Sequence, residues 1–131
     1  MKKQGILNMQ LAKLIAGCGH FDYFAVVDAG CPIPKGVEIV DLALTAEIPG
    51  WIDVLKATFE ELGVETCTVA NELFSEKHGR LGELKALIPD IQIDTIPHAQ
   101  FKKELANMKF VVRTGECLHF CNAIFMCGVS F

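Results

Sequence analysis

The sequence predicts a single α/β domain over residues 1–131, with three αβα layers and a largely parallel or mixed sheet. Two observations predict this fold class. Short runs rich in β-branched and aromatic residues alternate with segments whose apolar residues recur at helical spacing, which is typical of a sheet with helices on both faces. The length of 131 residues also suits one domain rather than a two-domain enzyme.

The first half of the chain predicts a helix, two strands and a second helix. Asn8 can cap the first helix and Gly17 or Gly19 can end it, with apolar residues between them on one face. The two strands and the second helix follow in chain order: Tyr23–Asp28, Val37–Leu44 and Pro49–Gly63. Apolar residues recur near a 3.6-residue period in that second helix, and Gly63 is a natural stop.

The second half predicts four strands and two helices. In chain order they are Val64–Ala70, helix Leu81–Leu87, Ile91–Ile96, helix Pro97–Met108, Phe110–Arg113 and Ala123–Val129. Val and Thr residues favour the strand that begins at position 64. Pro97 suits the first turn of a helix because its φ angle is already fixed near the helical value.

Charge and hydropathy exclude two classes of function. The chain has 12 Lys and Arg against 16 Asp and Glu, for a net charge of −4 and no basic run, which argues against nucleic-acid binding. No stretch of about 18 apolar residues predicts a membrane span. The mean hydropathy of +0.34 is high for a domain of this size, so we expect extra burial in a covered sheet or at subunit interfaces.

The N-terminal segment has two interpretations. Lys2, Lys3 and the run Ile15–Cys18 resemble a bacterial lipoprotein signal and its cleavage site. Three polar residues interrupt the apolar core that a signal needs: Asn8, Gln10 and Lys13. We therefore expect an amphipathic helix, a cytoplasmic protein and reduced cysteines.

The six cysteines do not form a C-x-x-C pair, so the usual zinc and thioredoxin spacings are absent. In an extended chain Cys117, His119 and Cys121 would point to one side, which supplies fewer than the four ligands of a closed zinc site. No glycine-rich phosphate loop and no G-x-S-x-G motif occurs, which argues against nucleotide-dependent transfer and serine hydrolysis.

Several polar residues directly follow predicted strands, where open α/β sheets bind their ligands. They are Asp28, Glu72, His98 and the loop 113–116. Asp28 can accept hydrogen bonds from a polyol or cap its own turn, and His98 can bind a ligand or simply begin a helix. Asn122, just before the last strand, can hydrogen-bond a hydroxyl.

His20 lies in the loop that enters the first strand. An imidazole has an unperturbed pKa of about 6.5, so it can give or take a proton near neutrality, but a single histidine can equally be a surface or capping residue. Arg113 and Glu116 are expected to pair with each other or to line a site. His78 lies in a polar segment and is expected to be solvated.

Short motifs follow one another in a fixed order along the whole chain. They are Met1–Lys3 with Gly5–Asn8, Gly19-His20 with Asp22, Asp28–Gly30 with Pro32 and Pro34, Asp41-Leu42, His98 with Phe101-Lys102, Arg113–Glu116, Asn122, and Gly128-Val129 with Phe131. In this order and spacing the chain resembles the RbsD/FucU family, and within it the branch that acts on ribose. The resemblance implies an RbsD-like fold and an isomerase that interconverts pyranose and furanose forms of ribose, feeding sugar uptake and phosphorylation, with no cofactor and no metal.

The resemblance also implies the site residues and the assembly. His20 is the expected proton-donating acid. The expected sugar-binding residues are Asp28, His98, Phe120, Cys121 and Asn122. Family members form rings, often two stacked pentamers, so we expect a homodecamer in which the segment 120–122 reaches a neighbour's site.

Phe120 stands where the family has a tyrosine, and three neighbours also differ from the family pattern: Leu118, His119 and Cys121. One hydroxyl that could contact the sugar is therefore missing. His119 either supplies a replacement polar group or points to solvent. The alternative functions are a mutarotase for fucose or another monosaccharide, a non-catalytic sugar-binding paralogue, and a thiol or metal protein that uses Cys117, His119 and Cys121.

Overall fold

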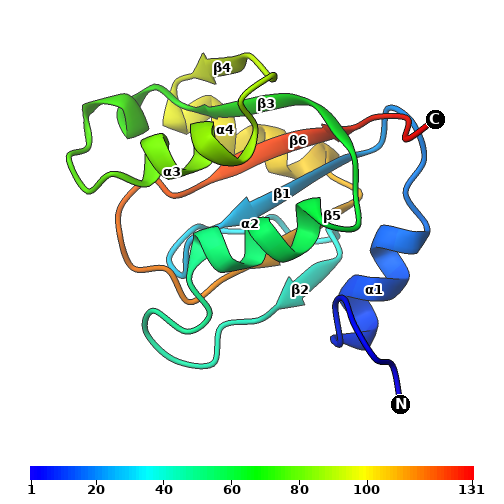
Figure 1. Ribbon diagram of the computed structural model, residues 1–131. Coiled ribbons are helices and arrows are strands. Elements are labelled where there is room, and N and C mark those ends of the chain that lie inside the picture. Colours follow the sequence, from blue (N-terminus) through cyan, green and yellow to red (C-terminus); the bar gives the residue numbers. More distant parts are fainter.

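A computed structural model describes residues 1–131 as one six-stranded mixed sheet with helices on both faces (Figure 1). The strands are β1 Tyr23–Val27, β2 Ile39–Asp41, β3 Val64–Ala70, β4 Ile93–Ile96, β5 Phe110–Arg113 and β6 Ala123–Cys127. The helices are α1 Met9–Ala16, α2 Trp51–Phe59, α3 Arg80–Leu87 and α4 His98–Glu104, with short 3₁₀ segments η1 Asn71–Ser75 and η2 Leu105–Asn107. The predicted α/β class is confirmed.

The strand order is β2-β5-β1-β6-β3-β4. β6 pairs antiparallel with both of its neighbours, β1 and β3, whereas the other pairs are parallel. The end of β6 therefore lies beside the start of β1, and residues just before β6 lie beside residues just after β1. This arrangement decides which side chains can meet at each edge of the sheet.

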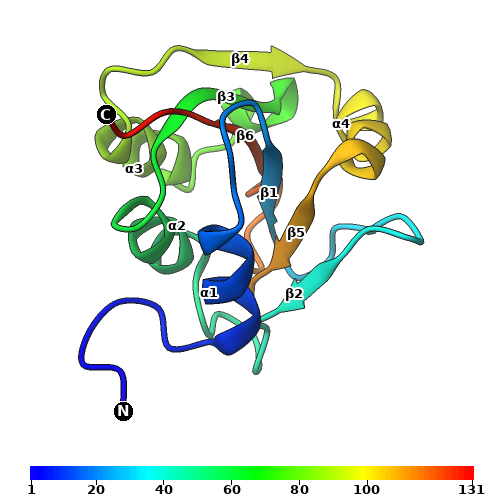
Figure 2. The same cartoon turned by 90° about the vertical axis from the view of Figure 1, so that its right-hand side faces the viewer.

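Alternation along β1 divides the core into two layers. Phe24 and Val26 belong to the larger cluster, which also contains apolar residues of α1, α2 and α3. Ala25 and Val27 belong to the smaller cluster, with Phe101 of α4. Three helices thus cover one face and α4 covers the other, as the view along the sheet shows (Figure 2).

Helix ends follow the expected local chemistry. The Asn8 side chain accepts a hydrogen bond from the Leu11 amide at 2.9 Å, and Gly17 is the C-cap of α1. At α2, Trp51 is fully buried, and its indole Nε1 donates to the Val26 carbonyl at 3.0 Å. That bond holds the start of α2 against the carboxyl end of β1.

Some predicted boundaries differ from the structure. The strand predicted over Val37–Leu44 is only Ile39–Asp41, an edge strand that pairs with β5 alone. The last strand ends at Cys127, short of the predicted Val129. The helix predicted over Pro97–Met108 is α4 followed by η2, and η1 was not predicted, because short 3₁₀ segments leave no periodic pattern in a sequence.

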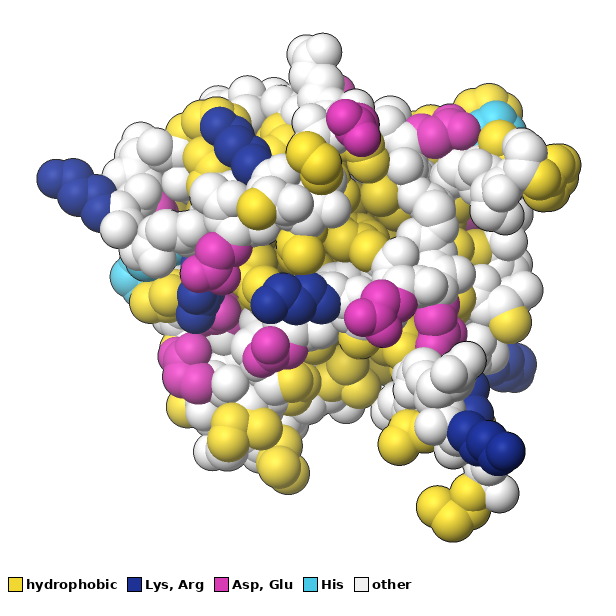
Figure 3. Space-filling model, in the orientation of Figure 1, with side chains coloured by type: hydrophobic (Ala, Val, Ile, Leu, Met, Phe, Trp, Pro, Cys, Tyr) yellow, Lys and Arg dark blue, Asp and Glu magenta, His cyan; other side chains and the backbone are white.

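Eleven large hydrophobic side chains remain exposed. Figure 3 shows hydrophobic side chains among scattered charges on one face. Near the start of β1 the exposed set comprises Phe21, Tyr23, Val129 and Phe131. The high mean hydropathy therefore reflects surface exposure as well as core burial. None of the helices is long and apolar enough to cross a membrane.

Candidate active site

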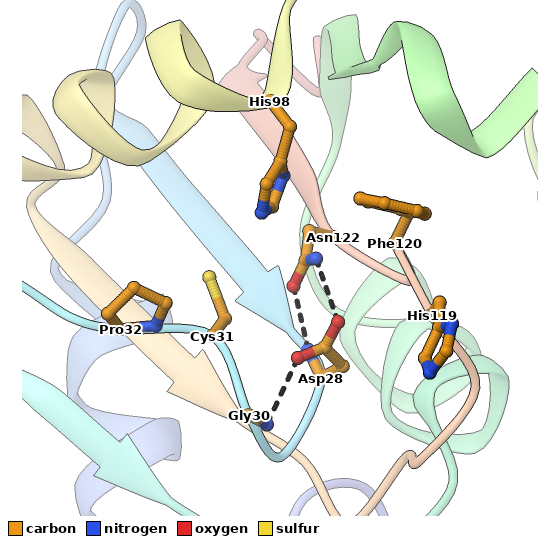
Figure 4. A pocket seen from close by; sticks show the side chains of 8 residues that line it. All are labelled: Asp28, Gly30, Cys31, Pro32, His98, His119, Phe120 and Asn122. Atoms are coloured by element: carbon orange, nitrogen blue, oxygen red, sulfur yellow. Dashed lines mark hydrogen bonds between the residues drawn. The ribbon is translucent and has the colours of Figure 1, made fainter.

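A carboxylate and an amide meet where β1 ends and β6 begins. Asn122 Nδ2 donates to Asp28 Oδ2 at 2.8 Å, and the Asp28 amide donates to Asn122 Oδ1 at 2.9 Å (Figure 4). The Gly30 amide donates to Asp28 Oδ1 at 3.0 Å. Because Asn122 is only 1% exposed, this double contact fixes the carboxylate at the sheet edge.

The Asp28–Asn122 pair lies in a pocket of about 250 Å³. Its lining residues are Asp28, Gly30, Cys31, Pro32, His98, His119, Phe120 and Asn122. Four lining residues carry strongly polar side chains, namely Asp28, His98, His119 and Asn122, although much of the lining surface is apolar. A small pocket with a fixed carboxylate suits a small polyhydroxylated ligand better than a large apolar one.

His98 begins α4 directly after β4. Its backbone amide donates to Glu72 Oε2 at 3.1 Å, and its ring meets the Phe120 ring edge-on with centroids 5.1 Å apart. The Nδ1 atom of His98 is buried and has no hydrogen-bond partner within the chain. Since a buried polar atom without a partner is costly, this nitrogen is available for a bound ligand.

Burial raises the pKa of Asp28 above its ordinary value. Hydrogen bonds from Asn122, Gly30 and Cys31 and the nearby His98 oppose that rise without cancelling it. The carboxyl group thus lies close to an imidazole in a partly dehydrated site, where each hydrogen bond to a ligand is stronger than in water.

The loop between β5 and β6 is anchored by Glu116, which is fully buried. Its carboxylate accepts hydrogen bonds from Arg80 Nε at 3.1 Å and from the Leu118 amide at 3.2 Å. Burial alone would raise the pKa of Glu116, but the amides of Leu118 and Trp51 and the Arg80 guanidinium hold it below its usual value. Arg113 instead pairs with Asp41 at 3.1 Å, so the ion pair between Arg113 and Glu116, one of the two expected alternatives, does not form.

Substituting Glu116→Gln should lower the free energy of unfolding by about 1–3 kcal/mol at neutral pH, because a buried charged pair loses one partner. Because the pKa of Glu116 is lower in the folded protein than the unfolded value of 4.5, the ionised carboxylate stabilises the fold above that pH. This contribution to stability is lost as the pH falls through the folded-state pKa. Denaturant unfolding from pH 7 to pH 3 should show the two proteins converge in acid. A constant gap across this range would contradict the assignment.

Phe120 turns the chain into the pocket. It has a left-handed backbone with φ of 61°, and its carbonyl accepts from the Asn122 amide at 2.8 Å. Next along the chain, Cys121 is fully buried in the larger core cluster, and burial raises the pKa of its thiol. The Cys121 side chain therefore does not line the pocket.

The segment 117–122 is a loop, not the extended chain assumed when Cys117, His119 and Cys121 were expected to share one side. Cys117 is exposed, His119 lines the pocket and Cys121 lies in the core. No group of three His, Cys, Asp or Glu side chains lies close enough to hold a metal ion. The three residues do not form a ligand set.

His20 lies away from this pocket, at the opposite end of β1. A strand rises about 3.3 Å per residue, so the five residues of β1 separate its two ends by roughly 13 Å. His20 Nε2 lies 3.1 Å from Glu65 Oε2, and its ring stacks on Phe21 with centroids 3.7 Å apart. Within one chain, the structure brings together Asp28, His98, Phe120 and Asn122 but not His20.

Sequence reasoning placed His78 in solvent, but its ring holds the pocket loop. The Arg80 amide donates to His78 Nδ1 at 3.3 Å, so Nε2 carries the hydrogen and donates to the His119 carbonyl at 3.0 Å. No sequence pattern could reveal a bond between residues 41 positions apart. In contrast, Gly30 and Pro32 lie in the loop that begins at Asp28, so the expectation that ligands bind after this strand could have placed them in the pocket wall.

The mixed α/β sheet and the polar pocket at a strand edge define a small-molecule-binding α/β domain. The model of the RbsD / FucU transport protein family matches residues 1–130, and this chain belongs to that family. It is 46% identical to the D-ribose pyranase of Bacillus licheniformis and 43% identical to that of Lactobacillus acidophilus, over 100% of each chain. The structure of Bacillus subtilis RbsD complexed with D-ribose matches with a TM-score of 0.94, 37% identity and full coverage of both chains.

Proposed function

We propose that this chain is an isomerase that interconverts the pyranose and furanose ring forms of D-ribose. The observation that carries the proposal is the pocket at the end of β1, where Asp28 is fixed by Asn122 beside a His98 nitrogen that has no partner. It occurs in a chain that aligns from end to end with D-ribose pyranases and with a ribose-bound relative.

The residues suit this chemistry. Opening a cyclic sugar removes the proton of the anomeric hydroxyl and protonates the ring oxygen, and closing through a different hydroxyl gives the other ring size. The reaction has no net oxidation or reduction and requires no cofactor. Imidazole groups transfer protons near neutrality, and Asp28 and Asn122 can hold sugar hydroxyls in a fixed orientation.

We further propose that the site works in an oligomer, a homodecamer of two stacked pentamers. His20 cannot reach the pocket of its own chain, but His20 of one copy can close the pocket of the next. The exposed side chains of Phe21, Tyr23, Val129 and Phe131 near His20 support an interface there. Phe120 and Asn122 of the segment 120–122, which we expected to reach a neighbour, line the pocket of their own chain.

Mixing two inactive variants tests the shared site. The His20→Ala variant keeps an intact pocket and the Asp28→Ala variant keeps His20. When the two are co-refolded in equal amounts, an intact pocket should meet a neighbour that has His20 in about a quarter of the sites, and these sites should be active. Ring-form exchange of ribose measures the recovery, and light scattering measures the mass of the assembly. A mixture that stays inactive, or a stable monomer with full activity, would contradict the shared site.

The second candidate function is a mutarotase for fucose or another monosaccharide, and Phe120 is the observation that favours it, since the pocket lacks a hydroxyl there. A panel of monosaccharides in exchange NMR distinguishes the two. We expect the largest acceleration with D-ribose, and an acceleration confined to L-fucose would establish the alternative. Binding of ribose without any exchange would indicate a sugar-binding paralogue.

We place the protein in the cytoplasm, acting on ribose before phosphorylation.

A further inference from the structure

Asp28 and Asn122 use part of their hydrogen-bonding capacity within the chain, and the rest is free for a ligand. Asp28 and Asn122 make two hydrogen bonds with each other, and Asp28 accepts a third from Gly30. The Phe120 side chain has no hydrogen-bonding atom. Apart from the thiol of Cys31, which is only a weak donor, the remaining hydrogen-bonding side chains of the lining are the imidazoles of His98 and His119.

Those two imidazoles flank the Phe120 ring. Both meet it nearly perpendicularly, with centroid distances of 5.1 Å for His98 and 6.3 Å for His119. In Figure 4, His98 lies above the Asp28–Asn122 pair and His119 lies to its right. A small ligand seated on Asp28 is therefore within reach of a histidine on each side of the Phe120 wall.

The backbone that carries His119 is held from three directions. His78 Nε2 donates to its carbonyl, the left-handed turn at Phe120 follows it, and the buried Glu116 anchors the loop before it. Neither ring nitrogen of His119 makes a hydrogen bond within the chain, and the residue is exposed. A fixed backbone with an unoccupied side chain reduces the entropy that is lost when a ligand binds.

We propose that the His119 imidazole hydrogen-bonds a hydroxyl of the bound monosaccharide and supplies the polar contact that the Phe120 wall lacks. This inference rests on the proposed function and adds a specificity-determining residue to it. The sugars that gain this hydrogen bond are those with a hydroxyl on the edge that faces Phe120. His78 acts as a positioning residue, because its ring holds the His119 carbonyl and does not line the pocket.

Three variants test the contact, with ribose as the probe in isothermal titration. Replacement by leucine, His119→Leu, should weaken ribose binding by about 5- to 150-fold, because one sugar hydroxyl is left without its partner. Glutamine keeps a donor and an acceptor, so His119→Gln should bind within about threefold of the wild type. Adding Phe120→Tyr to His119→Leu should recover most of the loss, since the phenol offers the missing group from the neighbouring position.

The exposed Cys117 on the same loop provides the matched control, and Cys117→Ala should bind ribose as the wild type does. Wild-type affinity in His119→Leu would overturn the proposal and leave His119 a solvated residue. A glutamine variant as weak as the leucine variant would overturn the hydrogen bond. A wild-type chain that neither binds nor exchanges ribose would overturn the proposed function itself, and this inference with it.

Discussion

Substituting His20→Ala should slow ring-form exchange of ribose by about 10²–10⁴-fold, the usual cost of losing one general acid. The fold should survive, because the His20 side chain is about a third exposed and makes only one polar contact, with Glu65. Exchange NMR measures the rate and thermal unfolding checks the fold. Rates within about twofold of the wild type would remove His20 from the mechanism.

The Glu65→Gln variant is the matched control for that result. It replaces the carboxylate that contacts His20 Nε2 with a neutral amide but leaves the imidazole in place. A surface contact of this kind contributes about 0–1 kcal/mol, so stability should change little. If exchange falls as far in this variant as in His20→Ala, the Glu65 carboxylate matters at this position as much as the imidazole does.

Substituting Asp28→Asn should weaken ribose binding by about 10- to 150-fold, because a charged acceptor in the pocket becomes neutral. It should also change the dependence of stability on pH. A carboxyl with a raised pKa in the folded protein stabilises the fold in its protonated form. This contribution is complete below the unfolded-state pKa of 3.8 and is lost as the pH rises through the folded-state pKa. The stability of the wild type relative to the variant should therefore fall from pH 3 to pH 7.

Isothermal titration and denaturant unfolding measure these two effects separately. The pH trend is opposite to that expected for Glu116→Gln, whose carboxyl has a lowered pKa. The two variants thus control for each other, since a nonspecific effect of low pH on the fold would shift the stability difference from the wild type in the same direction for both. Unchanged ribose affinity in Asp28→Asn would place the sugar outside the pocket.

The sequence predicted the elements well because local patterns determine them. Asn8 and Gly17 bound α1, and the apolar runs of β1 and β6 are the two central strands. The sequence also marked Asp28 and Asn122 as candidates beside strands, but inferring that they pair requires β1 and β6 to be antiparallel neighbours. That inference requires the strand order, which the sequence alone does not specify.

The contacts that hold the pocket loop could not be predicted. Arg80 and Glu116 are 36 positions apart, and Arg113, the nearer cation in sequence, pairs with Asp41 instead. Their partners depend on how α3 and the loop after β5 pack on the sheet. Similarly, the burial of Cys121 follows from the turn at Phe120, where a non-glycine residue adopts a left-handed backbone that no local pattern indicates.

The proposed reaction, exchange of the ring forms of ribose at the pocket of Asp28 and His98, can be measured by saturation-transfer NMR. The measurement follows transfer between the anomeric signals of the pyranose and furanose forms of D-ribose, with wild-type protein and with the His98→Ala variant. We expect the wild type to accelerate transfer well above the spontaneous rate and the variant to lose most of this acceleration. Transfer at the spontaneous rate with the folded wild-type protein would contradict the proposed reaction.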